Sequence, residues 1–320
     1  GANTGKGLGI TNELNFTASG ETDAGYTWSY SMELDPGATQ VSGDTDTEGS
    51  QSAQNDDTQL TLTTPYGTVG VFISEGGLDV EDAASQSVYG RPTDIGDPSA
   101  TSDNFTIDSY NNVQYHTPAD LLPFGVTAKI AYATNTADTS AGSSGNNAGA
   151  VTTGSATQNG ANATEIQVKA APIDGLAIGA SYFEFDMQGG SKRDQDAESG
   201  AWFATYAIGN VTLGYSQAAK ALLVSDRVGN SETVEHYEQD NMSIAYAIND
   251  DLSVSYEKET SEAHYLADTA DVEQKSTGIQ LAYNMGGMTV AIARNSHDNP
   301  SYSTTAADLD QTLLAVTMAF

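Results

Sequence analysis

The decapeptide YTWSYSMELD, residues 26–35, alternates apolar and polar side chains without a break. One face carries Tyr26, Trp28, Tyr30, Met32 and Leu34, and the other carries only hydroxyl and acidic side chains. A period of two over this length is a strong signal for a β-strand. The decapeptide therefore predicts a strand whose two faces meet different surroundings.

The same alternation recurs along the chain and predicts an all-β fold. Short connections rich in Asn, Asp and Gly, such as Gly209-Asn210 and Asn249-Asp250, join several of the segments, and these are strong hairpin signals. The predicted strands span 8–19, 26–35, 57–64, 68–75, 109–116, 125–134, 163–171, 176–186, 200–208, 211–220, 239–248, 251–260, 273–284, 288–297 and 309–320.

The connections alternate strictly between short and long, which a soluble β-sandwich has no reason to do. A transmembrane antiparallel up-and-down β-barrel has short turns on one side of the membrane and long loops on the other. Aromatic side chains gather beside the short turns, as in an interfacial girdle, at Phe16, Tyr26, Tyr206, Tyr215, Tyr246 and Tyr283. We therefore predict one barrel domain over 1–320 in a bacterial outer membrane.

The strand count also carries an expectation. Fifteen visible strands are odd, whereas bacterial single-chain barrels have an even number. We expect a first strand to be missing before 8–19, so that 309–320 does not close the barrel against it.

Composition restricts the function. The 320 residues hold 11 Lys and Arg against 43 Asp and Glu, a formal charge of −32, which argues against nucleic-acid binding because phosphate contacts require bases. Hydrophobic residues make up 38%, and no apolar run approaches the ~18 residues of a transmembrane helix. Cysteine is absent, so the redox compartment cannot be inferred.

Residues 75–108 form a polar segment too long for a plain connection, and such loops are usually functional or disordered. We predict that this segment folds into the barrel and narrows it; the alternative is a solvated surface loop. Besides Asp108, its charged residues are the predicted constriction: Glu75, Asp79, Glu81, Asp82, Arg91, Asp94, Asp97 and Asp103.

The clustered acids of this segment allow two further interpretations. Asp79, Glu81 and Asp82 suit the first turn of a short helix, because acids stabilise a helix N-terminus. Together with Asp94 and Asp97 they could instead hold Ca²⁺ through carboxylate oxygens.

Strand parity predicts the wall of the lumen. The charged or amide side chains expected there are Glu13, Glu33, Gln114, Lys129, Glu165 and Lys169. Parity points Lys258, Lys275 and Arg294 outward near the outer strand ends, where they would contact lipid or lipopolysaccharide. The four histidines lie in separate segments and are expected to be surface residues.

Three stretches carry a resemblance to a known family. They are ELNFTASGETDAG at 13–25, NVQYHTP at 112–118 and LAVTMAF at 314–320, which ends on Phe320. In this order they resemble the general trimeric porins of Gram-negative outer membranes, most closely the alphaproteobacterial ones. The terminal Phe320 is similar to the signal read by the outer-membrane assembly machinery.

The resemblance covers essentially the whole chain and implies 16 strands, a homotrimer and an inserted third loop at 75–108. It gives the loop at 36–56 the role of latching onto a neighbouring subunit. One departure matters: such porins place Arg or Lys on early strands opposite the acidic loop, whereas residues 8–75 here contain neither. Without these bases, the transverse electric field that such porins have across the constriction is in question.

The predicted function is passive diffusion of small hydrophilic solutes and ions through a water-filled, acidic, cation-selective pore, without catalysis or a cofactor other than the possible Ca²⁺. A substrate-selective channel would show aromatic or basic tracks in the lumen, and Phe72 and Phe183 are the exceptions to an otherwise small and polar inner face. An outer-membrane enzyme would need a Ser/His or Asp/His constellation near the rim, and none stands out.

Overall fold

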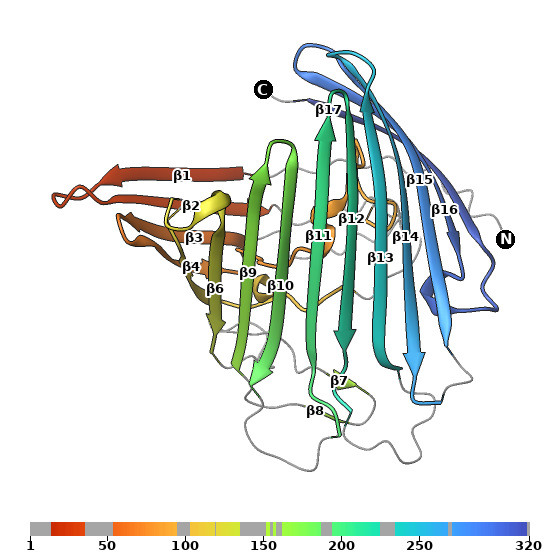
Figure 1. Ribbon diagram of the computed structural model, residues 1–320, viewed down its shortest axis with the longest axis horizontal. Coiled ribbons are helices and arrows are strands. Elements are labelled where there is room, and N and C mark those ends of the chain that lie inside the picture. Colours follow the sequence, from red (N-terminus) through yellow and green to blue (C-terminus); the bar gives the residue numbers. More distant parts are fainter. Residues whose placement is uncertain are drawn as a thin grey trace, which may run out of the picture.

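The computed structural model describes residues 14–35, 54–94, 103–118, 120–134, 152–153, 156–157, 162–186, 194–224, 234–267 and 271–318. It contains a 15-stranded antiparallel sheet in which each strand pairs with the next along the chain (Figure 1). The short turns lie at one end of the sheet, as the sequence predicts for an up-and-down barrel.

The strands follow the predicted segments within a few residues. They are β1 Leu14–Glu21, β2 Thr27–Asp35, β3 Gln54–Thr64, β4 Gly67–Ile73, β5 Asn112–His116, β6 Thr127–Ala133, β9 Asn162–Ile173, β10 Leu176–Asp186, β11 Glu198–Ile208, β12 Val211–Ala221, β13 Val234–Ala247, β14 Leu252–Tyr265, β15 Val272–Asn284, β16 Met288–Asp298 and β17 Leu309–Met318. The helical elements are single 3₁₀ turns: η1 Glu81–Ala84, η2 Ile107–Ser109, η3 Pro123–Gly125 and η4 Pro300–Tyr302. No helix in the described part of the chain has the length and apolarity to cross a membrane.

The structure departs most from the prediction in three places. β5 begins at Asn112 because η2 occupies the preceding residues. β13 and β14 extend further at their long-loop ends, where Val234 pairs with Tyr265, because polar residues on both faces hide the alternation there. Two short strands, β7 Thr152–Thr153 and β8 Ala156–Thr157, pair within the Gly- and Ser-rich stretch for which no strand was expected.

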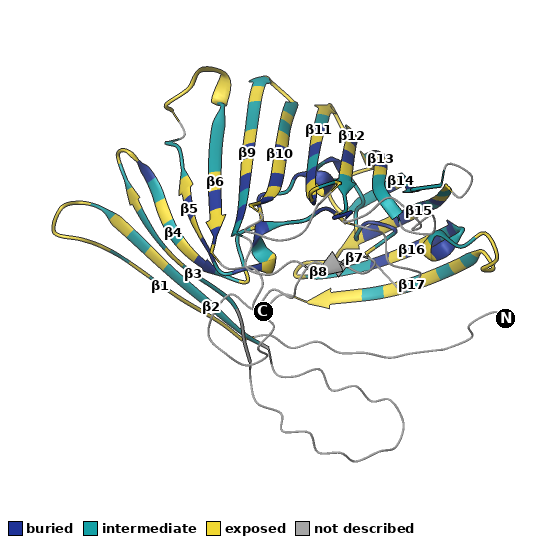
Figure 2. Ribbon diagram, turned by 90° about the horizontal axis from the view of Figure 1, so that it is seen from below, coloured by how far each residue is buried: buried dark blue, intermediate teal, exposed yellow. Residues whose placement is uncertain are grey.

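The sheet curls strongly, and β1 and β17 lie at its two free ends (Figure 2). Among the described residues, β1 pairs with β2 and β17 pairs with β16, and no register joins the two edges. The predicted additional strand would precede β1, where the residues lie outside the described part of the chain, so it stays a prediction. Glu13 and Phe320 also lie outside the described residues.

Burial alternates along the strands and separates the two faces of the sheet. On β12, Ser216 and Ala218 are buried, whereas Leu213 and Tyr215 point outward and are exposed. The inner face is small and polar, and the outer face is apolar, which is the pattern of a barrel in lipid.

The segment after β4 runs along the inner face of the curl, seen in orange behind β11 and β12 in Figure 1. Two small apolar clusters hold it there. One packs Leu78 and Ile107 against Phe183 and Phe185, and the other packs Val80 against Phe203. Since these side chains are buried, the described part of the segment packs against the sheet and is not a solvated loop.

Candidate functional site

The first part of the inserted segment is bonded to β9 and β10. Glu165 is fully buried on β9, and its Oε2 accepts the backbone N–H groups of Leu78 at 3.3 Å and Ile107 at 2.8 Å. The N–H of Val80 donates to the Ser181 hydroxyl on β10 at 3.1 Å. The backbone of the segment therefore uses the wall in place of a β-ladder partner.

The next part continues along β14 and β15. The N–H of Val88 donates to Ser255 Oγ at 3.0 Å, and the N–H of Tyr89 donates to Gln280 Oε1 at 2.9 Å. Gln280 also donates from Nε2 to the carbonyl of Gly90 at 2.5 Å. Because a buried backbone group without a partner is costly, these amide and hydroxyl side chains fix the path of the segment.

Glu257 on β14 is the second buried carboxylate of the wall. It accepts hydrogen bonds from the hydroxyls of Ser85, at 2.7 Å, and Ser87, and from the amide of Asn241. Our sequence interpretation did not include Glu257 or Glu259 in the lumen wall. Strand parity could have identified them. Lys258 lies between them and is predicted to point outward, so its two neighbours must point inward.

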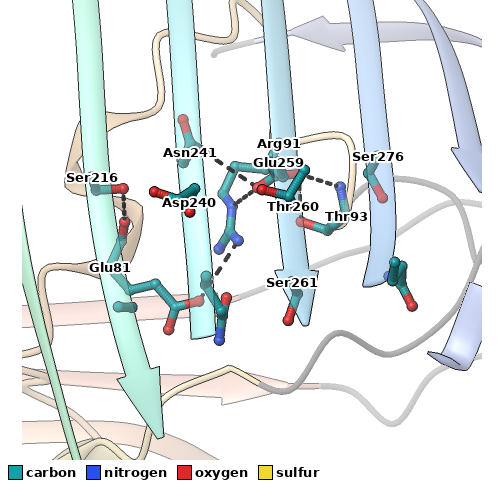
Figure 3. A pocket seen from close by; sticks show the side chains of 13 residues that line it. Glu81, Arg91, Thr93, Ser216, Asp240, Asn241, Glu259, Thr260, Ser261 and Ser276 are labelled. Carbon is teal, nitrogen blue, oxygen red and sulfur yellow. Dashed lines mark hydrogen bonds and ion pairs between the residues drawn. The ribbon is translucent and has the colours of Figure 1, made fainter. Parts of the chain in front are cut away.

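Arg91 is the centre of an ionic cluster between the segment and the wall (Figure 3). Its Nε lies 2.6 Å from Glu259 Oε1, and it also pairs with Asp82. Asp94 and Glu81 lie at 3.9 and 4.0 Å. Burial alone lowers the pKa of Arg91, but these carboxylates, Glu259 foremost, raise its pKa well above the usual value, so the guanidinium stays charged.

Two acids of the segment are hydrogen-bonded, and Glu81 is buried whereas Asp79 is half-buried. Burial raises the pKa of Glu81 to about 8, although Arg91 and the N–H of Asn104, 2.8 Å from Oε2, oppose the shift. Burial also raises the pKa of Asp79, whose Oδ1 accepts from Asn104 Nδ2 at 3.1 Å and from Ser181 Oγ at 2.9 Å. Asp79 and Glu81 thus exchange protons nearer to neutral pH than free carboxyls do.

The acids gather around a cavity of about 320 Å³ on the segment. Its lining, which lies wholly in the described residues, contains five carboxylates and no base: Gly77, Asp79, Glu81, Asp82, Asp103, Asn104, Thr106 and Asp108. Of the predicted constriction residues, Glu75, Arg91 and Asp94 lie outside this lining, and Asp97 lies outside the described residues.

A second cavity of about 20 Å³ lies behind the segment, where Figure 3 shows Arg91, Asn241 and Glu259 converging. That volume holds a single water molecule. The segment therefore packs closely against β12–β15 at this point.

The bases of the inner face are few. Lys129 and Lys169 lie on β6 and β9 near the short-turn end, as predicted, and Lys129 pairs across the ladder with His116. Lys220 on β12 was not predicted. Its Nζ donates to the Asp103 carbonyl at 2.5 Å and lies 4.5 Å from the Phe105 ring.

The remaining predicted residues divide between support and open wall. Gln114 is buried and donates from Nε2 to the Gly76 carbonyl at 2.5 Å, which holds the start of the segment. Glu33 lies half-buried on β2. Phe72 and Phe183 are buried beneath the segment, so they do not form an aromatic track along an open lumen.

The predicted calcium ligands do not converge in the described part of the chain. The groups of three His or acidic side chains whose ligand atoms lie within 4.8 Å of one another include none of Asp79, Glu81, Asp82 and Asp94. Asp82 and Asp94 are directed to Arg91 instead. Calcium binding by this set stays a prediction.

Comparison with known proteins gives one family. The family model described as Gram-negative porin matches residues 1–317. No curated protein sequence matches the chain.

Several solved structures have a similar fold. OmpF of Salmonella typhi, in complex with daunomycin, is 14% identical with a TM-score of 0.63, over 99% of this chain and 94% of that one. The anion-selective porin of Comamonas acidovorans is 13% identical with a TM-score of 0.61, over 98% and 89%. A mutant of the Rh. blastica porin is 15% identical with a TM-score of 0.55, over 96% and 89%.

Proposed function

The chain belongs to the Gram-negative porin family, and from this premise we propose that it conducts small hydrophilic solutes and ions by passive diffusion through an acidic, cation-selective pore. Membership of that family supports an outer-membrane channel protein. The observation that carries the selectivity is the cavity whose lining offers five carboxylates and no base.

The charges around the passage support a preference for cations over anions. Strands β1 to β4, which form the part of the wall away from the segment, contribute no base. Residues 14–35 and 54–75 contain neither Lys nor Arg. Carboxylates in a cleft with low-dielectric walls concentrate the field and attract cations. Arg91 offsets only part of this field, because it is shared between Asp82 of the lining and the buried Glu259 of the wall.

Salt should weaken the preference in a defined way. The Debye length is about 10 Å at 0.1 M salt and about 3 Å at 1 M. The electric field of the acids therefore extends across a pore at low salt, but at high salt it extends only over a single contact. A bound Ca²⁺ would neutralise two charges and reduce the preference without abolishing it.

The experiment is the reversal potential across planar bilayers in a KCl gradient, at low and high mean salt and at a pH above about 8, where Glu81 is ionised. We expect wild type to prefer K⁺ most strongly at low salt, and the variant Asp79→Asn/Glu81→Gln/Asp82→Asn to lose most of that preference. The matched control is Asp23→Asn/Asp174→Asn/Asp250→Asn, which removes three exposed acids from short turns. It should behave like wild type.

Two results would overturn the proposal. One is an anion preference at low salt. The other is an equal loss of K⁺ preference in both variants, which would mean that total charge, rather than this segment, sets the selectivity.

We further propose that the protein is a homotrimer. An apolar hollow of about 740 Å³ lies on the outward side of β2–β6, lined by residues such as Trp28, Leu60 and Val71. The segment 36–56, proposed to latch a neighbouring subunit, follows β2 in the sequence, and its residues before β3 lie outside the described part of the chain. Lys258, Lys275 and Arg294 would contact lipid or lipopolysaccharide, and Phe320 would carry the assembly signal.

A further inference from the structure

Two histidines form a pair at the long-loop ends of β13 and β14, which lie at the lower edge in Figure 1. His236 and His264 are cross-strand partners, and their rings stack at 4.4 Å with 9° between the planes. Both continue the outward-facing parity, because the inward positions Gln239 and Ser261 are buried on the opposite face. The pair is therefore outside the pore.

Carboxylates surround the imidazole nitrogens. Glu262 Oε2 and Glu238 Oε2 lie 3.7 and 3.9 Å from His264 Nε2, and Glu238 Oε1 lies 3.7 Å from His236 Nε2. The side chains of His236 and Glu238 are 35% and 63% exposed, so an ion can reach the group from solvent.

His264 is held in one orientation. Its Nδ1 lies 3.3 Å from Asp271 Oδ2, and Asp271 Oδ1 in turn accepts the N–H of Tyr265 at 2.8 Å. Donation from Nδ1 to Asp271 leaves the lone pair on Nε2, which is buried and makes no hydrogen bond. A carboxylate that fixes the tautomer of a histidine in this way is the usual outer-shell partner of a metal ligand.

We propose that His236, His264, Glu238 and Glu262 bind a borderline divalent transition-metal ion, with Zn²⁺ as the representative, and that Asp271 is the positioning residue. Imidazole nitrogen with carboxylate oxygen suits Zn²⁺ rather than Ca²⁺ or Mg²⁺, which prefer oxygen alone. Tetrahedral Zn²⁺ with ligands at about 2.0–2.2 Å separates its ligand atoms by about 3.4 Å. The three separations that link these residues, 3.7, 3.9 and 3.7 Å, need only a small contraction. His236, Glu238 and His264 already lie within 4.8 Å of one another, and Glu262 joins them through His264.

The site would tie the outer ends of three strands together. His236 and Glu238 come from β13, Glu262 and His264 from β14, and Asp271 directly precedes β15. Because these groups face away from the lumen, metal binding is independent of the selectivity proposed above. Its failure would leave that proposal untouched.

The test is isothermal titration of Zn²⁺ into untagged, folded protein in detergent, with millimolar Mg²⁺ present to occupy non-specific carboxylates. We expect one Zn²⁺ per chain. His236→Gln and His264→Gln should each abolish saturable binding, and Asp271→Asn should keep the stoichiometry but weaken affinity about 10–100-fold. The control His116→Gln, in a histidine remote from this group, should bind as wild type does.

Single-channel conductance checks that each variant is folded, and it should not change. Co²⁺ gives a second measurement, since its visible absorption in wild type should have the intensity of four-coordinate nitrogen and oxygen ligation. The proposal is overturned if wild type shows no saturable Zn²⁺ binding, or if His264→Gln binds as tightly as His116→Gln.

Discussion

Arg91 is the residue on which the charge balance of the inserted segment depends. It is 7% exposed and contacts carboxylates from both the segment and the wall. Burying such a group is unfavourable unless partners compensate for the lost hydration, and removing one partner leaves the other charge uncompensated. The position therefore tolerates little change.

Arg91→Gln should lower the free energy of unfolding by about 3–5 kcal/mol, because Glu259 would stay buried without its counter-charge. It should also increase the noise of the open-channel current as the segment loosens. Urea unfolding in lipid vesicles measures the first effect and bilayer recording the second. Arg294→Gln removes an exposed arginine on β16, and its unfolding should stay within about 0.5 kcal/mol of wild type. Equal shifts in both variants would contradict the role of Arg91.

Glu81 should make selectivity depend on pH. Its pKa is raised from the usual 4.5 to about 8, so the folded protein keeps a proton that the unfolded chain loses between these values. The stability from the protonated form is fully present below about pH 4.5 and disappears as pH rises through about 8. The preference for K⁺ should accordingly increase across about pH 8.

Reversal potentials on either side of about pH 8 measure this step. Glu81→Gln should remove it, whereas Asp103→Asn, in an exposed residue of the same cavity, should retain it. A step of unchanged size in Glu81→Gln would assign the titration to another group.

At the scale of the element, the segment lies against β12 so closely that the strand needs a glycine there. A Cβ built on Gly214 would lie 1.8 Å from the carbonyl oxygen of Ala84, and this oxygen also accepts the Ser243 hydroxyl at 2.6 Å. The clashing atom belongs to the backbone, so no side-chain rotation can relieve the clash. The segment itself must move.

Gly214→Ala should displace η1 away from the wall and into the passage, which lowers single-channel conductance. Gly200→Ala on the neighbouring strand is the matched control, because the nearest atom to its added Cβ is 3.2 Å away. Conductance measured in planar bilayers should fall clearly in the first variant and little in the second. An unchanged value for Gly214→Ala would contradict the close docking of the segment.

The strands were predictable because alternation is a local pattern, and β10 has the predicted bounds. The docking of the segment was only partly predictable. Its acidity indicated a site, but the partners Glu257 and Gln280 are 172 and 191 residues distant from Ser85 and Tyr89. Sequence periodicity gives the face of a strand on which a residue lies. It does not show which inward residues meet a loop that crosses the seven strands from β9 to β15. Lys220 was missed for the same reason.

At the scale of the whole molecule, the proposed trimer makes the two tryptophans unequal. Trp28 lines the apolar hollow on β2–β6, whereas Trp202 is exposed on the outer face of β11. If the hollow is covered by a neighbouring subunit, lipid reaches Trp202 but not Trp28.

Quenching by brominated lipid acyl chains tests this with one tryptophan at a time. Fluorescence of Trp202, measured in Trp28→Phe, should be strongly quenched, and that of Trp28, measured in Trp202→Phe, should be protected. Equal quenching of both would contradict a subunit interface at the hollow.

The contacts of the inserted segment also imply an order of events in time. Its successive residues meet successive strands: Leu78 bonds to β9 over a separation of 87 residues, Val80 to β10 over 101, and Tyr89 to β15 over 191. Contacts between residues so distant in sequence form late in folding. The far part of the segment depends on partners from β14 and β15. A nascent barrel therefore passes through a wide form and acquires its narrow passage as a late step.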